Sequence, residues 1–245
     1  MLGELPTRFE REPVVGTGLG GDETTAVDAA AEAAILARFR DLDDVTIVSE
    51  EIGRLGTGST TVVIDPIDGS LNAKRGLPFF SVSIAVADGP TMGDVHFGYV
   101  YDFGSGEEWI GRLGGGATVN GEPLTVKPKD TLEILSFEAT LTELIARDAP
   151  KIAGVAYRLR ILGSLALSLC NLAAGRIDGV CSLKPARAVD IAAAQLLVRE
   201  AGLAISLFDD QRSFGEAELD LEGRSRVAAA GTEALCRQVA DALSA

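Results

Sequence analysis

Ile64-Asp65-Pro66-Ile67-Asp68-Gly69-Ser70-Leu71-Asn72 is the stretch of this 245-residue chain that decides its fold and its chemistry. The residues just before it, 60–63, are all β-branched, which is typical of a buried strand. Pro66 stiffens the backbone and Gly69 permits a sharp turn. We therefore expect a strand whose end directs the carboxylates of Asp65 and Asp68 at one point.

These two carboxylates suit a metal ion, and the residues after them suit an anion. Hard divalent cations such as Mg2+ prefer oxygen ligands of this kind. If a helix begins after Gly69, the free N–H groups of Gly69, Ser70 and Leu71 form an anion site. Asp-Pro and Asp-Gly pairs also occur in ordinary turns. A turn alone does not explain the strand, the carboxylates and the anion site together, so the stretch indicates a metal-dependent phosphatase.

The composition is that of a globular protein with a substantial core. The chain is 47% hydrophobic, and no apolar run approaches the roughly 20 residues of a membrane span. Its first residues lack the basic stretch and apolar core of a signal peptide, so we expect a cytoplasmic protein without membrane partners. The net charge of −14 would repel nucleic acid. A phosphorylated small molecule remains compatible with it, because bound divalent cations reverse the local field.

The few histidines and cysteines exclude other enzyme classes. His96 is the only histidine and lies in a strand-like segment, so a Ser-His-Asp hydrolase is not expected. Cys170, Cys181 and Cys236 are widely spaced among apolar neighbours, which indicates buried small side chains. Chemistry based on carboxylates and metal ions needs no histidine.

The apolar pattern changes near residue 130. Before it we expect one helix over 24–40 and strands at 45–49, 60–64, 79–87, 95–102 and 109–110, with a hairpin at Asn120-Gly121. After it, helices at 163–175, 190–201 and 232–243 alternate with strands at 177–181, 203–207 and 226–230. The prediction is an α/β (α+β) protein with two halves. Residues 1–130 form an α+β half with most metal ligands, and residues 131–245 form an α/β half that completes the site.

Further acidic residues can complete the metal site. Glu50 and Glu51 end the strand over 45–49, Asp190 opens a helix, and Asp28 lies in the first helix. Taken singly, Asp190 is explained as a helix cap and Asp28 as part of a solvated face. They gain meaning only in combination with the stretch at 64–72.

In combination these segments resemble the inositol monophosphatase superfamily, the Mg2+-dependent, lithium-sensitive sugar phosphatases. The similar segments are, in order, Ser49-Glu50-Glu51, Asp65-Pro66-Ile67-Asp68-Gly69-Ser70, Gly163-Ser164 and Val189-Asp190-Ile191-Ala192-Ala193. The resemblance runs from about Gly21 to the C-terminus. It is strongest to the archaeal branch, which contains dual inositol-1-phosphatase/fructose-1,6-bisphosphatases. It implies a layered αβαβα sandwich and a homodimer.

The resemblance also implies the metal ligands. Glu50, Asp65 and the carbonyl of Ile67 would hold one Mg2+. Asp65, Asp68 and Asp190 would hold a second. Mg2+ is therefore the expected cofactor, with Mn2+ as a substitute, and Glu50 is counted among the catalytic residues.

The remaining implied roles concern water and phosphate. Glu51 and Asp28 would help to place a third, weaker ion or its water. Ser70, in place of the usual threonine, would orient the attacking water together with Asp28, so both are implied catalytic residues. The backbone N–H groups of Gly69 and Ser70 would bind the phosphate, with Ser164 also at the substrate.

Three arginines bear on the substrate. Arg158 and Arg160 precede the Gly163-Ser164 segment and Arg187 precedes Asp190, so all three could converge on the outer rim of the site. The planar guanidinium suits phosphate, although each arginine alone is equally well explained by a surface ion pair. Two arginines beside the metals would hold a second phosphate. We expect activity on fructose 1,6-bisphosphate and inositol 1-phosphate, with the bisphosphate preferred.

Two other functions remain open. The same scaffold could hydrolyse 3′-phosphoadenosine 5′-phosphate or NADP, but such relatives tend to carry larger insertions, for which 245 residues leave little room. The chain could also be a non-catalytic, metal-binding regulatory relative. Such a relative would have no reason to keep every metal ligand, so we expect a phosphomonoester hydrolase.

Overall fold

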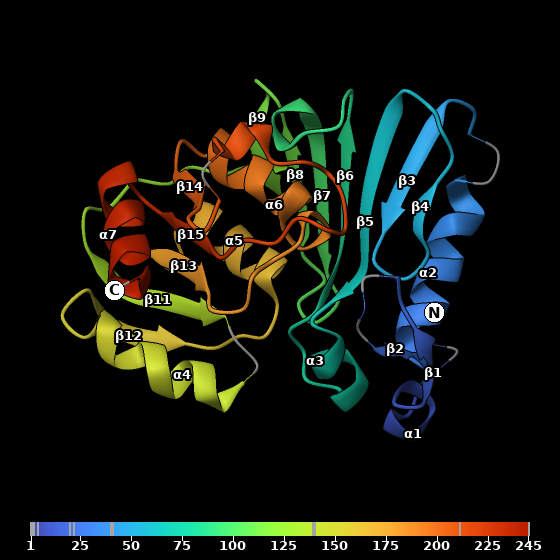
Figure 1. Ribbon diagram of the computed structural model, residues 1–245, viewed down its shortest axis with the longest axis horizontal. Helices are drawn as coiled ribbons and strands as arrows, with labels where there is room; N and C mark the ends of the chain where they lie inside the picture. The colour runs from blue at the N-terminus through green and yellow to red at the C-terminus, as the bar shows by residue number, and fades with distance from the viewer. Residues whose placement is uncertain are drawn as a thin grey trace.

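The structure of the protein is a computed structural model that describes residues 3, 5–19, 21, 23–39, 42–138, 141–210 and 212–244. Two large sheets are separated and flanked by helices (Figure 1). From one side to the other, the layers are α2, an eight-stranded sheet, α5 with α6, a five-stranded sheet, and α4 with α7. The predicted αβαβα sandwich is confirmed.

The eight-stranded sheet comes from the first half of the chain. Its order is β10-β9-β8-β7-β6-β5-β3-β4, and β3 and β5 are its one parallel pair within the described ranges. Its strands are β3 (Val45–Ser49), β4 (Gly53–Leu55), β5 (Thr60–Asp68), β6 (Ser81–Ala87), β7 (Val95–Asp102), β8 (Glu108–Arg112), β9 (Gly116–Val119) and β10 (Glu122–Pro123). Asn120 and Gly121, with φ of 51° and 81°, make the predicted hairpin turn between β9 and β10. The pairing of β5 with β6 is irregular between Asp65 and Asp68, so the decisive stretch leaves the regular ladder there.

The five-stranded sheet has the order β12-β11-β13-β15-β14, and β11 is parallel to both of its neighbours. Its strands are β11 (Leu132–Glu138), β12 (Ala156–Arg160), β13 (Gly179–Ser182), β14 (Ala204–Leu207) and β15 (Val227–Ala230). The sequence pattern did not predict β11, β12 or the helix α4 (Thr142–Asp148) between them. The edge strand β12 is largely exposed and therefore lacks the apolar alternation that reveals a strand.

Two apolar helices fill the space between the sheets. Nearly all residues of α5 (Leu165–Ala173) and α6 (Ala188–Glu200) are buried, as expected for helices that are hydrophobic all round. α6 approaches the first sheet closely over two glycines. A Cβ added to Gly98 would lie 2.5 Å from the carbonyl oxygen of Ala193, and one added to Gly111 would lie 3.2 Å from the nitrogen of Leu197. These glycines therefore set the height of α6 above β7 and β8.

The outer layers cover the remaining faces. α2 (Ala26–Phe39) packs Ile35, Leu36 and Phe39 on the first sheet, and α7 (Glu233–Ser244) and α4 cover the second. The short elements α1 (Arg8–Arg11), β1 (Val14–Thr17) and β2 (Glu23–Thr25) precede α2. The largest hydrophobic cluster contains residues from both sheets and from α5 and α6. Because this core is shared, the division of the chain at residue 130 stays a prediction.

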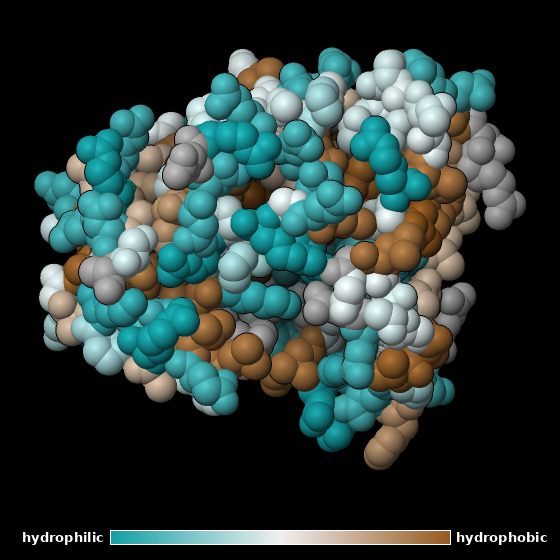
Figure 2. All heavy atoms as spheres, in the orientation of Figure 1, coloured by the Kyte–Doolittle hydropathy of each residue, from teal (hydrophilic) through white to brown (hydrophobic). Residues whose placement is uncertain are grey.

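Among the described residues, no helix combines the length and the apolar character that a membrane span requires. Figure 2 shows the face of the molecule that is seen in Figure 1, and on this face hydrophilic side chains gather between the two sheets. Hydrophobic side chains gather at its right, over β4 and α2.

Candidate active site

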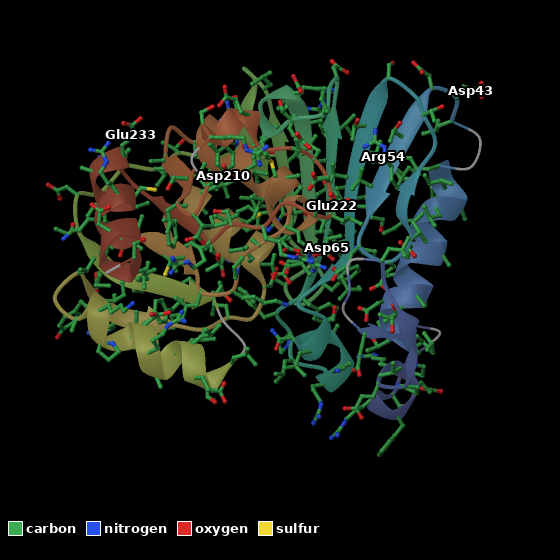
Figure 3. All side chains as sticks on the ribbon, in the orientation of Figure 1. Asp43, Arg54, Asp65, Asp210, Glu222 and Glu233 are labelled. Carbon is green, nitrogen blue, oxygen red and sulfur yellow. The ribbon has the colours of Figure 1, made fainter. Side chains whose placement is uncertain are left out.

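The candidate active site is a cavity of about 290 Å3 between the two sheets. β3 and β5 are parallel, so Glu50, which follows β3, lies beside Asp65 near the end of β5. The parallel strands β11, β12 and β13 likewise end at this cavity, where they place Glu138, Gly163 and Ser182. Figure 3 shows Asp65 in the middle of the molecule, between the sheets. Both halves of the chain therefore supply the lining of the site.

Three carboxylates in the cavity, Glu50, Asp65 and Asp190, form an acidic trio. Each offers one oxygen, and the three oxygens lie within 4.8 Å of one another. Asp190 projects from the first turn of α6, where its Oδ2 accepts the backbone N–H of Arg187 at 2.7 Å. Asp65 is buried, and its Oδ1 accepts the N–H of Ile67 at 3.0 Å. This donor set is the kind that hard divalent cations bind.

The trio is electrostatically strained without an added positive charge. Burial raises the pKa of Glu50 to about 7, against the opposing effect of the Arg187 guanidinium. Burial also raises the pKa of Asp65 well above its ordinary range, and the charge of Glu50 adds to the effect. A proton or a metal ion lowers both the free-energy cost of burying these charges and their mutual repulsion. The trio therefore fits a bound cation.

Asp68 lines the same cavity as the trio and is held by α5. Its Oδ2 accepts the Ser164 hydroxyl at 2.5 Å and the Ala166 N–H at 2.7 Å, and the Leu165 nitrogen lies 3.4 Å from Oδ1. Burial raises the pKa of Asp68 to about 7, although these hydrogen bonds lower it. Asp68 thus joins β5 to the N-terminus of α5. Its role as ligand to a second ion stays a prediction.

Glu51 lies beside the trio at the cavity, whereas Asp28 is buried and is not among the residues that line the cavity. Glu51 lines the cavity and accepts a hydrogen bond from the Thr24 hydroxyl. Burial raises the pKa of Glu51. Asp28 accepts the N–H and the hydroxyl of Thr25 through Oδ2, at 3.0 and 2.5 Å, whereas its Oδ1 is buried without a hydrogen-bond partner among the described residues. An unsatisfied buried carboxylate oxygen is unfavourable, and a cation or its water would satisfy it.

The anion side of the site is the start of α3 (Ser70–Arg75). Gly69 has a φ of +91°, and an added Cβ would lie 3.0 Å from the carbonyl oxygen of Gly163, so the position requires glycine. α3, α5 and α6 all begin at the cavity, where helix N–H groups lack intrahelical partners. The Ser70 hydroxyl donates to the Ile67 carbonyl at 2.9 Å. The phosphate and water roles of Gly69 and Ser70, and the ligand role of Ile67, stay predictions.

The chain is similar to proteins of one known family over nearly its whole length. Residues 5–244 match the inositol monophosphatase family. The chain belongs to this family. The fructose-1,6-bisphosphatase/inositol-1-monophosphatase of Archaeoglobus fulgidus is 34% identical over 94% of this chain and 87% of its own. The Nus factor SuhB of Escherichia coli is 35% identical over 91% of this chain and 85% of its own.

A solved structure agrees. The MJ0109 gene product, described as an inositol monophosphatase-fructose 1,6 bisphosphatase, matches with a TM-score of 0.86 and 31% identity, over 99% of this chain and 93% of that one. The predicted superfamily and its archaeal likeness are confirmed, and with them the phosphatase class of the enzyme.

In this family member Arg187 lies inside the site, which corrects the expected position on the outer rim. Its side chain is 8% exposed, with Nη2 at 2.5 Å from Glu50 Oε1 and 3.4 Å from Asp190 Oδ1. Burial lowers the pKa of Arg187, but the charges of Asp190 and Glu50 outweigh it and raise the pKa further. The guanidinium therefore neutralises part of the acidic trio.

The other two arginines do not line the cavity. Arg158 forms an ion pair with Glu133 at 2.9 Å and lies over the ring of Tyr157. Arg160 donates to the carbonyl of Leu159 at 2.9 Å. Both are exposed on the edge strand β12. Their contact with substrate stays a prediction, and this geometry gives it no support.

Glu138, Lys184 and Arg224 are among the cavity-lining residues that the sequence pattern did not indicate. Lys184 follows β13, so its place after a strand was the available signal. Glu138 ends a strand that the pattern did not reveal, and Arg224 lies in an irregular segment before β15. None of the three belongs to a recognisable motif.

Proposed function

We propose that this family member is a Mg2+-dependent phosphomonoester hydrolase that acts on fructose 1,6-bisphosphate and inositol 1-phosphate. The observation that carries the proposal is one cavity that combines the acidic trio with the N-termini of α3 and α6. Carboxylates suit the divalent cation, and helix N-termini suit the phosphate. The relatives named for both activities support these two substrates.

The chain supplies ligands, orientation and proton acceptors. Glu50, Asp65 and Asp190 would hold the ion. When bound, Mg2+ neutralises charge on the phosphoryl group and makes a water more acidic. The N–H groups at the start of α3 would orient the phosphoryl oxygens. The Ser70 hydroxyl would orient the attacking water, and the unsatisfied Oδ1 of Asp28 would accept its proton.

A substrate panel tests the proposal. Phosphate release is measured on fructose 1,6-bisphosphate, inositol 1-phosphate, 3′-phosphoadenosine 5′-phosphate and NADP, each with Mg2+, with Mn2+ and with EDTA. We expect turnover of the first two with either ion, and none in EDTA. Faster turnover of the nucleotides would favour the alternative activity. No release from any of the four would overturn the proposal.

The preference for the bisphosphate is assigned to two exposed cations of the cavity lining, Lys184 and Arg224. Charge-assisted hydrogen bonds to the second phosphate contribute roughly 1.5–3 kcal/mol each, or about ten- to a hundredfold in kcat/KM. Lys184→Met and Arg224→Met should each reduce kcat/KM for the bisphosphate far more than for inositol 1-phosphate. If Arg158→Met or Arg160→Met has that effect and these two do not, the arginines of β12 bind the second phosphate.

We further propose a homodimer that acts in the cytoplasm. The dimer is supported by exposed apolar side chains near β1 and β4, with Leu19 72% and Leu55 54% exposed. Light scattering should give the mass of two chains, and Leu19→Glu with Leu55→Glu should give one. A monomeric wild-type protein would exclude the dimer, and cell fractionation tests the location.

The proposal includes no nucleic-acid partner, because the net charge of −14 opposes phosphate backbones. One relative is named a Nus factor, so direct RNA binding is worth measuring. A mobility-shift assay at physiological salt should show no complex, and a stable complex would refute this part.

A further inference from the structure

We propose that Glu138 is a positioning residue of the active site. It would fix the loop at 162–164, and through that loop it would fix Asp68 and the start of α5. This inference rests on the proposed phosphatase function, but it concerns a residue that does not belong to the acidic trio.

Glu138 gathers hydrogen bonds from three segments of the second half. It ends β11 and is 7% exposed. Its Oε1 accepts the hydroxyls of Ser136 and Ser168 at 2.6 and 2.7 Å, and the N–H of Leu162 at 3.3 Å. Its Oε2 accepts the N–H of Gly163 at 2.9 Å. One side chain therefore joins its own strand, α5 and the loop.

These donors are all uncharged. Among the described residues, no Lys or Arg forms an ion pair with Glu138, and burial of a carboxylate without a cation is unfavourable unless hydrogen bonds satisfy it. A glutamine of the same shape would replace one acceptor oxygen by an N–H2 group, which would face a hydroxyl or N–H donor. The position therefore suits a carboxylate, whose two oxygens accept all of these donors.

The loop is also held from the first half of the chain. Asn72, in α3, donates through Nδ2 to the carbonyls of Leu162 at 2.9 Å and Phe79 at 2.8 Å. Gly163 has a φ of +84°, and an added Cβ would lie 2.8 Å from Asn72 Nδ2. The loop is therefore clamped between Glu138 on one side and Asn72 on the other.

The loop held by Glu138 and Asn72 places the Ser164 hydroxyl within hydrogen-bond distance of Asp68. The Ser164 hydroxyl donates to Asp68 at 2.5 Å and accepts the N–H of Leu167 at 3.2 Å, so it caps α5 while it holds the carboxylate. Since Gly163 and Ser164 are adjacent, a shift of the Gly163 N–H displaces this donor. Glu138 thus sets the orientation of Asp68 without contacting it.

The test compares two glutamate-to-glutamine variants on the same strand. Glu138→Gln should lower kcat about ten- to a hundredfold with KM nearly unchanged, because misplacement of about 1 Å can cost that much. Mn2+ binding, followed by electron paramagnetic resonance, should weaken about tenfold, since outer hydrogen-bond partners of metal ligands have effects of that size. Glu133→Gln is the control, because Glu133 is exposed and paired with Arg158. It should change neither quantity.

A double-mutant cycle shows whether Glu138 acts through the loop. The losses in kcat from Glu138→Gln and Ser164→Ala should be clearly less than additive. Additive losses, or wild-type kcat and Mn2+ affinity in Glu138→Gln, would overturn the inference.

Two readouts guard against ambiguous results. If Glu138→Gln does not fold, Asn72→Ala releases the same loop from the other side and should reproduce the fall in kcat. Unchanged kcat in that variant would overturn the inference. If the wild-type protein releases no phosphate from any substrate, the proposed function fails, while the Mn2+ affinities still test Glu138.

Discussion

Asp65 is the residue whose charge should matter most to metal binding, because it is the buried member of the acidic trio. Asp65→Asn keeps the shape and the acceptor for the Ile67 N–H but removes the charge. We expect kcat to fall at least about a hundredfold, since metal ions supply several kcal/mol to such reactions. In EDTA at pH 8 the same variant should have a higher Tm than the wild type, because repulsion with Glu50 and Asp190 is relieved. Near wild-type turnover at saturating Mg2+ would refute the assignment.

Arg187 and the proposed metal ion would compete for the same carboxylates. Arg187→Met keeps an extended side chain but removes the cation from Glu50 and Asp190. We expect Mn2+ to bind about tenfold more tightly at pH 8, a change of about 1.4 kcal/mol. The Tm in EDTA should fall, because buried carboxylates lose a partner. Calorimetric titration and thermal unfolding measure the two effects, with the exposed Arg158→Met as control. Weaker Mn2+ binding in Arg187→Met would mean that Arg187 orients Glu50 for metal binding and does not compete with the ion.

The site was predictable wherever a residue type coincided with a strand or helix end. The apolar pattern reveals the strands that end near Glu50 and Asp65 and the helix that Asp190 opens, whereas the meeting of the three carboxylates was predicted from the resemblance to the family. The inward direction of Arg187 could not be predicted, because it depends on Glu50, which lies 137 residues away in the chain. Glu138 carries no motif, and its neighbours reveal its role only after the fold has brought them together.

At the scale of elements, the close approach of α6 to the sheet links packing to chemistry. A Cβ at Gly98 would lie 2.5 Å from the Ala193 carbonyl oxygen, so Gly98→Ala must move the helix. We expect a loss of about 1–3 kcal/mol in unfolding free energy, as for other overpacked cores. A fall in kcat should accompany it, because Asp190 moves with α6. Gly215→Ala is the control, since its Cβ would meet the nearest atom at 3.8 Å. Urea unfolding gives the unfolding free energy and steady-state kinetics give kcat. Equal values of both quantities in Gly98→Ala and Gly215→Ala would contradict the prediction.

Elements were predictable where one face is buried. β6 alternates between buried and half-exposed residues along its whole length, which gives the period of two that the sequence shows. β12 lies at an edge and buries little, so its pattern resembled a loop. Helix α6 was found, although two residues late, because its apolar length outweighs the ambiguity of its start.

At the scale of the molecule, the acidic trio and Asp68 make stability depend on pH and metal together. The pKa values of Glu50 and Asp68 are about 7 in the folded protein, above the ordinary values of about 4 in the unfolded chain. The folded state therefore binds more protons between pH 4 and 7, and the contribution of these groups to stability falls as the pH rises through that window. Mg2+ needs the deprotonated groups, so it should stabilise more at pH 8 than at pH 5.5.

Thermal unfolding in Mg2+ and in EDTA at both pH values measures this linkage. The rise in Tm on adding Mg2+ should be larger at pH 8 by several degrees, on the scale of roughly 2–4 °C per kcal/mol for a chain of this size. Asp65→Asn serves as the reference, because all surface carboxylates are shared with the wild type. Equal Mg2+ effects at pH 5.5 and pH 8 in the wild type would exclude the linkage.

The parallel strands of both sheets end at one cavity. Residues that can change substrate preference therefore lie at a different end of the strands from residues that affect only stability. The segment 183–186 follows β13 at this cavity, whereas the turns at 88–94 and 113–115 lie at the opposite end of the first sheet. Libraries of variants in the segment 183–186 should yield enzymes with new substrate preferences, because this segment lines the cavity without belonging to the acidic trio or to the loop at 162–164. Libraries in the distant turns should change only expression yield and stability. Laboratory evolution of new substrate preferences would therefore select substitutions at the cavity end of the strands.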